Sequence, residues 1–196
     1  MVFADIFDRQ FAPHLERREQ AFRLMLEGLD QVDQPNIVET GCVRKEGNWN
    51  DGQSTLIFDR YVQEMGGTLT TVDIAAEHCD LARMLTSKAD VVCSDSVRYL
   101  YERAMPPQGP AIDLLYLDSY DVDFDSPHPA ALHHLKELCG ALRLLSPQAV
   151  IAVDDNLTND GAISSGKGLY VSQFMADIGA ELLHAGYVHV WSLDRH

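Results

Sequence analysis

Basic residues are scarce in this chain. It has 15 Lys and Arg against 30 Asp and Glu among its 196 residues, which gives a formal net charge of −15 at pH 7. An excess of negative charge repels phosphate backbones and anionic lipid surfaces, so we expect neither a nucleic-acid partner nor a membrane partner. Cationic or neutral small molecules are weakly favoured as ligands.

The chain also lacks a long hydrophobic run. Although 46% of its residues are hydrophobic, no stretch is long enough to cross a bilayer. Its first residues, Met1-Val2-Phe3-Ala4-Asp5, do not show a basic region followed by an apolar one, the pattern of a secretory signal. We therefore expect a cytoplasmic protein with one domain and a sizeable core.

Cysteines are few and widely spaced. None of the four belongs to a paired zinc-ligand pattern, so we expect free, mostly buried thiols at Cys42, Cys79, Cys93 and Cys139. A nucleophilic cysteine needs a neighbouring base. The sequence places none beside Cys42, the one cysteine in a predicted ligand loop.

No Gly-x-Gly-x-x-Gly follows the first predicted strand, which argues against a nicotinamide dehydrogenase. Instead, the β-branched run 37–40 includes Glu39 and leads into Gly41, where the backbone can turn sharply at little steric cost. A helix can then begin with Asp51 or Ser54 as its N-cap. The segment predicts a strand, a ligand-binding loop and a helix.

Two further strands end in polar residues. The apolar run 68–73 ends at Asp73, where α/β nucleotide-binding proteins hold a ribose diol. The next strand, near 90–93, is followed by Ser94 and Asp95. Acids at neighbouring strand ends predict a pocket for an adenosyl group.

With these residues the chain resembles the class I S-adenosylmethionine-dependent methyltransferases, over roughly residues 35–193. The resemblance implies that Glu39 and Gly41 lie at the methionine part of the cofactor, that Asp73 takes the ribose hydroxyls, and that Ser94 or Asp95 lies near the adenine. The glycine-rich loop of that family is stretched here by residues 43–51 and is split between Gly41 and Gly52. Gly52, Ser54 and Asp118 complete the set of predicted cofactor-binding residues.

Helical and strand patterns alternate along the rest of the chain. Apolar residues at helical spacing over 5–29 predict an N-terminal helical cap within 1–33, ahead of a cofactor-binding and catalytic core at 34–196. Strands are expected near 36–40, 68–73, 90–93, 112–117 and 148–154, and helices near 54–65, 76–87, 95–104, 129–143 and 168–178. Ala185-Gly186 predicts a two-residue turn in a terminal hairpin. These elements predict a three-layer, Rossmann-like methyltransferase fold with a mostly parallel seven-stranded sheet closed by an antiparallel hairpin.

Acids gather at the ends of the fourth and fifth strands. Asp118 follows the former, and Asp155-Asn156 follow the latter. Two carboxylates and an amide oxygen suit Mg²⁺ or another divalent cation. The pattern resembles the metal-dependent O-methyltransferases of the catechol and caffeoyl-CoA type, in which the ion binds the acceptor's oxygens. An alternative is that Asp154 and Asp155 are solvated or helix-capping acids.

The catechol-type lysine base is absent, because Asp121 stands at its position. Candidate bases are Asp121, His128, Tyr120 and Lys167, with His128 preferred because it lies in a Pro-flanked loop near the predicted pocket. His133-His134 are expected on a solvated or packed helix face.

Two loops are expected to border the acceptor. Residues 164–168, Ser-Ser-Gly-Lys-Gly, predict a mobile cationic loop in which Lys167 orients an acidic acceptor or acts as a base; an exposed lysine at a helix start is the alternative. This segment and the Glu-Thr-Gly start resemble the sugar and small-molecule O-methyltransferases of macrolide tailoring. Trp49 is expected in a lid over the cofactor or acceptor, whereas Trp191 is expected in the core.

Three functions remain open. The first is methyl transfer from S-adenosylmethionine to a hydroxyl of a small molecule, with or without a divalent cation. The second is N-methylation of a small amine, and the third is a non-catalytic S-adenosylmethionine-binding subunit. The oligomeric state is open, a homodimer included.

Overall fold

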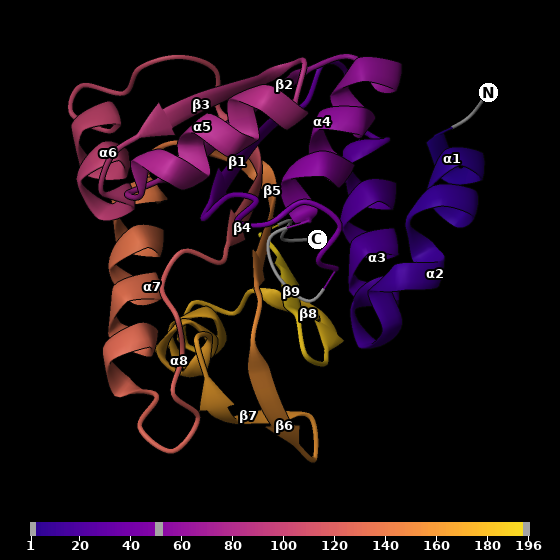
Figure 1. Ribbon diagram of the computed structural model, residues 1–196. Helices are drawn as coiled ribbons and strands as arrows, with labels where there is room; N and C mark the ends of the chain where they lie inside the picture. Colours follow the sequence, from indigo (N-terminus) through magenta and orange to yellow (C-terminus); the bar gives the residue numbers. More distant parts are fainter. Residues whose placement is uncertain (1–2, 50–52, 194–196) are drawn as a thin grey trace.

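A computed structural model describes residues 3–49 and 53–193. Strands and helices alternate, and the helices cover both faces of a central sheet (Figure 1). The helices are α1 (Phe3–Gln10), α2 (Ala12–Leu15), the 3₁₀ helix η1 (Glu16–Arg18), α3 (Glu19–Leu29), α4 (Ser54–Met65), α5 (Ala76–Leu85), α6 (Ser96–Arg103), α7 (His128–Ala141) and α8 (Leu169–Asp177). The strands are β1 (Asn36–Thr40), β2 (Thr68–Asp73), β3 (Ala89–Cys93), β4 (Ile112–Leu117), β5 (Leu145–Val153), β6 (Asn156–Asn159), β7 (Ala162–Gly166), β8 (Glu181–Ala185) and β9 (His189–Ser192).

The central sheet has seven strands in the order β3-β2-β1-β4-β5-β9-β8. Strands β1 to β5 pair in parallel, whereas β9 is antiparallel to both of its neighbours. This confirms the predicted fold class. The strand order reverses between β1 and β4, and open α/β sheets bind ligands at the carboxyl ends of the strands beside such a reversal.

The terminal hairpin differs from its prediction in one detail. Ala185 pairs with His189, so residues 186–188 make the connection. The predicted two-residue turn at Ala185-Gly186 is wrong because Ala185 is the last residue of β8.

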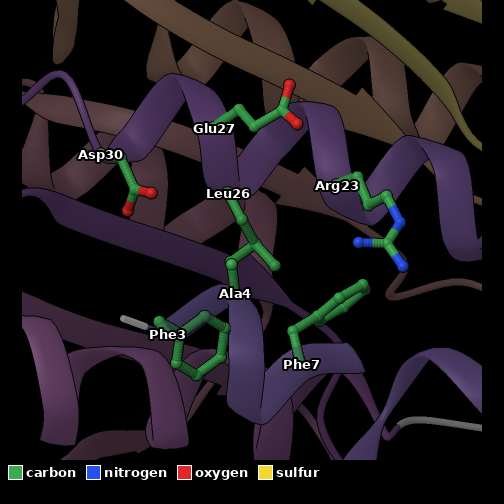
Figure 2. A pocket seen from close by; sticks show the side chains of 7 residues that line it. All are labelled: Phe3, Ala4, Phe7, Arg23, Leu26, Glu27 and Asp30. Carbon is green, nitrogen blue, oxygen red and sulfur yellow. The ribbon is translucent and has the colours of Figure 1, made fainter. Parts of the chain in front are cut away.

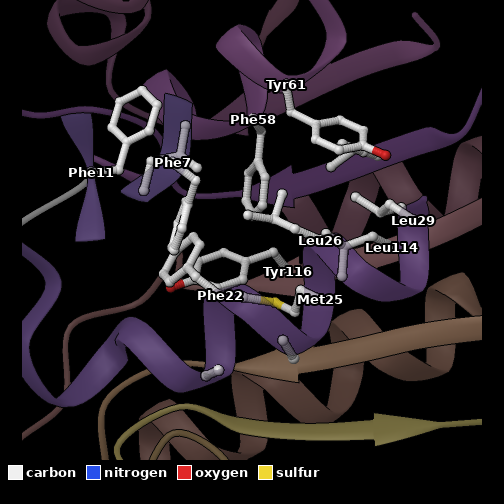
Figure 3. Close-up of a cluster of buried hydrophobic side chains, with 14 of the residues drawn as sticks. Phe7, Phe11, Phe22, Met25, Leu26, Leu29, Phe58, Tyr61, Leu114 and Tyr116 are labelled. Atoms are coloured by element: carbon white, nitrogen blue, oxygen red, sulfur yellow. The ribbon is translucent and has the colours of Figure 1, made fainter. Parts of the chain in front are cut away.

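Side chains on successive strand residues alternate between two apolar cores. Tyr116 packs with Phe22 and Phe58 in the core shared with α1, α3 and α4 (Figure 3). Ile37 belongs to the same core. On the opposite face, Val38 packs with residues of α6, α7 and α8. This alternation is the period of two expected of strands covered on both sides. Trp191 belongs to the second core, as predicted.

The N-terminal segment is helical as predicted, but it is divided. Pro13 lies in the first turn of α2, where its missing N–H costs no hydrogen bond, and Glu16 has a positive φ of 47°. The helices α1, α2 and α3 contribute to the same apolar core as one face of the sheet. Within the described residues, no helix has both the length and the apolar character needed to cross a membrane.

A short antiparallel hairpin, β6–β7, lies below the main sheet in Figure 1. The sequence predicted a mobile loop at 164–168, and this is wrong because residues 162–166 form β7. Gly166 has φ +133°, and a Cβ there would come within 2.7 Å of the Asn156 Cα. The hairpin therefore depends on a glycine at this position.

Candidate functional site

The candidate site begins where β1 and β4 end. Gly41 has φ +82°, and a Cβ on it would lie 2.6 Å from the carbonyl oxygen of Asp118. The Asp118 N–H donates to the Thr40 carbonyl at 2.9 Å, and the Gly41 N–H donates to the Val72 carbonyl at 2.8 Å. These bonds hold three strand ends together, and only glycine fits between them.

A cavity of about 240 Å³ opens at the ends of β2 and β3. Its lining comprises Val72, Asp73, Ile74, Asp95, Ser96, Ser119, Tyr120 and His133. Two predicted cofactor residues, Asp73 and Asp95, are thereby brought together. Ser94, the alternative to Asp95 near the adenine, is not among these lining residues, and its hydroxyl donates to the Asp95 carbonyl at 3.3 Å.

Asp73 is fixed by the backbone around it. Its carboxylate accepts from the Cys42 N–H at 3.2 Å and from the Ala75 N–H at 2.8 Å, and only 6% of the residue is exposed. Asp95 caps α6 by accepting from the Arg98 N–H at 2.8 Å. Both acids are held in place before any ligand arrives, as a binding site requires.

A buried carboxylate supports the far wall of this cavity. Glu137 accepts from the Ser119 hydroxyl at 2.7 Å and lies 3.3 Å from His133 Nε2, which in turn contacts the Ser96 hydroxyl at 3.2 Å. Burial alone would raise the pKa of Glu137, but the bond from His133 and the nearby imidazoles hold it below its usual range. The sequence predicted His133 only as part of a solvated or packed helix face, and it did not indicate Glu137, whose one local signal is its i, i+4 spacing from His133.

Glu39 was expected to lie at the methionine part of the cofactor. Its side chain instead lies behind the loop that follows β1. It is fully buried and accepts from the hydroxyls of Thr55 and Thr71, both at 2.7 Å. Thr55 in turn accepts from the Val43 N–H at 3.0 Å. Burial raises the pKa of Glu39 to about 7. Glu39 therefore joins β1 to α4 and to the loop backbone.

The other residues predicted for the loop between β1 and α4 do not lie together. Gly52 and Asp51 lie outside the described residues. Ser54 begins α4 and is buried beside the narrow pocket described below. The Cys42 thiol is also buried, and burial raises its pKa, so it is unsuited to act as a nucleophile. Cys93 departs from the expected burial because β3 is the edge strand.

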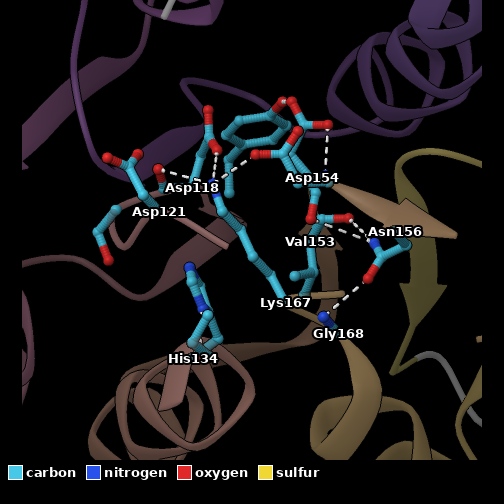
Figure 4. Close-up of polar contacts among 12 residues, drawn as sticks. Asp118, Asp121, His134, Val153, Asp154, Asn156, Lys167 and Gly168 are labelled. Carbon is cyan, nitrogen blue, oxygen red and sulfur yellow. Dashed lines mark hydrogen bonds and ion pairs between the residues drawn. The ribbon is translucent and has the colours of Figure 1, made fainter. Parts of the chain in front are cut away.

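Lys167 is the centre of an ionic cluster at the ends of β4 and β5 (Figure 4). Only 1% of the residue is exposed. Its ammonium donates to the Asp118 carboxylate and lies 2.8 Å from Asp155 Oδ2. Burial alone would lower the pKa of Lys167, but the two carboxylates raise it above its usual value. The expected exposed or mobile lysine is therefore wrong, and a protonated Lys167 is a poor base.

Asp154 completes the cluster; it directly follows β5 and is buried. It accepts from the Tyr116 hydroxyl at 2.7 Å and pairs with the Arg18 guanidinium at 3.0 Å. Arg18 also lies 3.6 Å from Asp155, whose carboxylate accepts from the Tyr187 hydroxyl. Arg18 was not predicted from the sequence, because nothing in the local sequence relates it to a strand end 136 residues away.

The cluster has three carboxylates and two cations. Burial, followed by the charges of Asp154 and Asp155, raises the pKa of Asp118 to about 8 despite the opposing effect of Lys167. The pKa of Asp155 moves the other way, because contacts with Lys167 and Tyr187 outweigh its burial.

The predicted metal ligands do not form a metal site in this arrangement. Asn156 Oδ1 accepts from the Gly168 N–H at 2.7 Å, while its amide donates to the Val153 carbonyl at 2.8 Å (Figure 4). The Lys167 ammonium lies between Asp118 and Asp155. In the described part of the chain, no three His, Cys, Asp or Glu side chains are grouped so as to hold a metal ion.

Two of the three other predicted bases, His128 and Asp121, lie apart from the cluster, whereas Tyr120 lines the cavity at Asp73. His128 is exposed at the start of α7, with Nδ1 2.7 Å from the Tyr170 hydroxyl. Asp121 is paired with Arg44 at 2.5 Å, and 81% of its side chain is exposed. Neither lines the cavity at Asp73 or the two pockets at Arg18 that are described below.

A cleft leads from the surface to the ionic cluster. Its outer part measures about 230 Å³ and is lined by His14, Leu15, Glu16, Arg17, Arg18, Trp49 and Tyr187. Its inner part is narrow, about 10 Å³, and is lined by Leu15, Arg18, Phe22, Trp49, Gln53, Ser54, Tyr116, Asp118 and Asp154. Three residues line both parts, so the two adjoin.

The outer cleft has aromatic walls. The Trp49 ring stacks on His14, with centroids 4.6 Å apart and planes at 14°. The Arg17 guanidinium lies 3.4 Å from the centroid of the Tyr187 ring. Flat apolar surfaces next to a guanidinium suit a planar or sugar-like small molecule.

Another hollow, of about 50 Å³, lies between α1 and α3 (Figure 2). Phe3, Phe7 and Leu26 line it, with charged residues at its edge. No strand-end residue contributes to it, so we assign it to helix packing.

Comparisons with known proteins bear on the fold. No protein-family model and no curated protein matches the sequence. Among solved structures, the MycE methyltransferase from the mycinamycin biosynthetic pathway, in complex with Mg and SAH, matches 91% of this chain with a TM-score of 0.62 and 12% identity. The match covers 50% of the MycE chain, so the present chain spans about half of its length.

Two other solved structures match over nearly their whole length. A TehB-like SAM-dependent methyltransferase from Corynebacterium glutamicum gives a TM-score of 0.52 at 13% identity, over 93% of this chain and 99% of that one. The sugar N-methyltransferase KedS8 from Streptoalloteichus gives 0.56 at 10% identity, over 100% and 94%. At such identities the likeness concerns the fold, which is that of Rossmann-like methyltransferases.

Proposed function

We propose that this chain is an S-adenosylmethionine-dependent methyltransferase that acts on a hydroxyl of a small molecule. One observation carries the proposal. The cavity at Asp73 and the cleft at Arg18 meet at two consecutive residues, because Ser119 lines the former and Asp118 the latter. A donor pocket and an acceptor pocket that meet at a strand end are what group transfer requires.

The residues of the cavity fit the cofactor. Asp73 would hold the ribose hydroxyls, because its carboxylate is fixed at the end of β2 on the cavity wall. Asp95 and Ser96, at the start of α6, would lie on the adenine side. The backbone after Gly41 would hold the methionine part. When bound, S-adenosylmethionine would supply a sulfonium methyl group: the acceptor oxygen would bond to the methyl carbon as the carbon–sulfur bond breaks, which would leave the methyl ether, S-adenosylhomocysteine and one proton.

The chain's own residues then orient the acceptor and receive the proton. Trp49 and Tyr187 form walls that position the acceptor and exclude water. Asp118 faces the inner cleft, and its pKa of about 8 lies close to the value that suits a general base near neutral pH. We therefore favour Asp118 as proton acceptor over the sequence-based candidates His128, Asp121 and Lys167.

An amine acceptor is the second candidate. The ionic cluster has one carboxylate more than it has cations, and this excess favours a positively charged group nearby. We therefore keep N-methylation of a small amine as the alternative to O-methylation. Incubation with labelled S-adenosylmethionine and matched alcohol and amine acceptors, followed by NMR of the product, would identify the methylated atom. Tight cofactor binding with no methyl transfer to any acceptor would favour the non-catalytic subunit.

Calorimetry with S-adenosylhomocysteine tests the proposal directly. We expect the wild-type protein to bind S-adenosylhomocysteine. Asp73→Ala should lose about ten- to hundredfold in affinity, since a hydrogen bond to a charged group contributes about 1.5–3 kcal/mol. Asp80→Ala is the control, because Asp80 is an exposed acid on α5 paired with Arg83. Absence of binding to the wild-type protein would overturn the proposal, and equal affinities in the two variants would remove Asp73 from the site.

A further inference from the structure

The β6–β7 hairpin delivers Lys167 to the strand ends. Lys167 follows the last residue of β7, and its N–H donates to the Asp155 carbonyl at 3.2 Å. Glycines flank it: a Cβ on Gly166 or on Gly168 would come within 3 Å of atoms of Asn156. This close approach brings the lysine side chain back over the end of β5.

All three donors of the Lys167 ammonium have partners. They are Oδ1 of Asp118, the backbone carbonyl oxygen of Asp118 at 3.3 Å, and Oδ2 of Asp155 at 2.8 Å. An ammonium has three N–H groups and no acceptor, so no donor is left for a substrate. Lys167 is therefore a fixed positive charge rather than a direct ligand of the acceptor.

We propose that the Lys167 ammonium is the built-in cation of this site, lying between Asp118 and Asp155 where a divalent cation would otherwise bind. The protein accordingly holds no divalent cation there. Lys167 is a positioning residue: it holds the Asp118 carboxylate at the inner end of the acceptor cleft. This role in catalysis rests on the proposed function, whereas the occupancy by lysine does not.

Two other features of the cluster agree with this assignment. Asn156, the third predicted metal ligand, has its carbonyl oxygen bonded to the Gly168 N–H. The Arg18 guanidinium supplies a second cation on the other side of Asp155 and Asp154. A divalent ion beside these two cations would meet strong repulsion, so it can bind only if Lys167 leaves.

Electron paramagnetic resonance of Mn²⁺ with the full chain tests the assignment. The wild-type protein should leave the spectrum of free Mn²⁺ unchanged, because Lys167 already neutralises the carboxylates. Lys167→Met, which keeps the length of the side chain and removes its charge, should bind Mn²⁺ about tenfold or more tightly than the wild type. A further Asp155→Asn substitution should abolish that gain.

Lys136→Met is the matched control, because Lys136 lies on α7 away from the cluster and is not buried, and it should behave as the wild type does. Wild-type Mn²⁺ binding that disappears in Asp155→Asn would overturn the proposal. So would a folded Lys167→Met that binds no Mn²⁺, since its carboxylates would then form no cation site. If Lys167→Met does not fold, the comparison of wild type with Asp155→Asn decides alone. S-adenosylhomocysteine calorimetry on the same samples tests the methyltransferase proposal separately.

Discussion

The Cα of Gly41 lies against the backbone of Asp118, so closely that a Cβ would be 2.6 Å from the Asp118 carbonyl oxygen. This contact joins the ends of β1 and β4 at the point where the strand order of the sheet reverses. It sets the separation between the predicted methionine end of the cofactor and the acid at the acceptor cleft. The site therefore depends on backbone packing as well as on its charged side chains.

Gly41→Ala should both destabilise the protein and weaken S-adenosylhomocysteine binding. Gly47 is a matched control, since it also has a positive φ but a Cβ on it would meet nothing within 4 Å. Both alanines incur about 1–2 kcal/mol for the left-handed backbone. Gly41→Ala should lose about 1–3 kcal/mol more from the collision with Asp118, as overpacking typically costs. Urea denaturation measures the difference, and equal losses would mean that the two loops separate freely.

Much of the fold could be predicted because its signals are local. The run 68–73 ending in Asp73 and the turn at Gly41 each predict their structure from a few adjacent residues, and both are where the sequence indicated. The ionic cluster could not be predicted in this way. Arg18, Asp118 and Lys167 come from distant parts of the chain, and only their packing shows that an ammonium lies between the carboxylates.

The error at Lys167 has a specific cause. The sequence 164–168 is rich in Ser and Gly, which is typical of a loop. In the structure these glycines allow the hairpin to approach Asn156, and the lysine between them becomes buried. Composition alone cannot distinguish a glycine that gives mobility from one that permits close packing.

Stability should depend on pH through Glu39. Burial raises its pKa from 4.5 to about 7 in the folded protein. Because this pKa is raised on folding, the stabilisation from neutral Glu39 is complete below about pH 4.5 and is lost as pH rises through about 7. Between these limits the free energy of unfolding, relative to that of Glu39→Gln, should fall by roughly 3 kcal/mol.

Urea denaturation of both proteins at several pH values measures this change. Glu27→Gln is the control, because Glu27 is exposed on α3. Its difference from the wild type should stay within about 0.5 kcal/mol across the range, as is usual for surface substitutions. A pH-independent difference for Glu39→Gln as well would show that the pKa of Glu39 is the same in the folded and unfolded states, as for a hydrated carboxyl.

The last prediction concerns Arg18, which connects the N-terminal helices to the strand ends. Its side chain is 16% exposed and that of its partner Asp154 is 3% exposed. Removing one partner of a buried ion pair leaves the other charge uncompensated, so Arg18→Leu should reduce the free energy of unfolding by about 3–5 kcal/mol. Arg23→Leu provides the comparison, since Arg23 pairs with Asp8 at 2.6 Å while being about a third exposed. That substitution should cost about 1 kcal/mol or less, as for surface pairs.

A double-mutant cycle separates the ion pair from the loss of packing. In an Asp154→Asn background the charge paired with Arg18 is gone, so Arg18→Leu should cost less there than in the wild type. Equal costs in the two backgrounds would mean that the guanidinium contributes packing alone. In that case the N-terminal helices would be held to the sheet by their apolar face, and Arg18 would have no electrostatic part in the acceptor cleft.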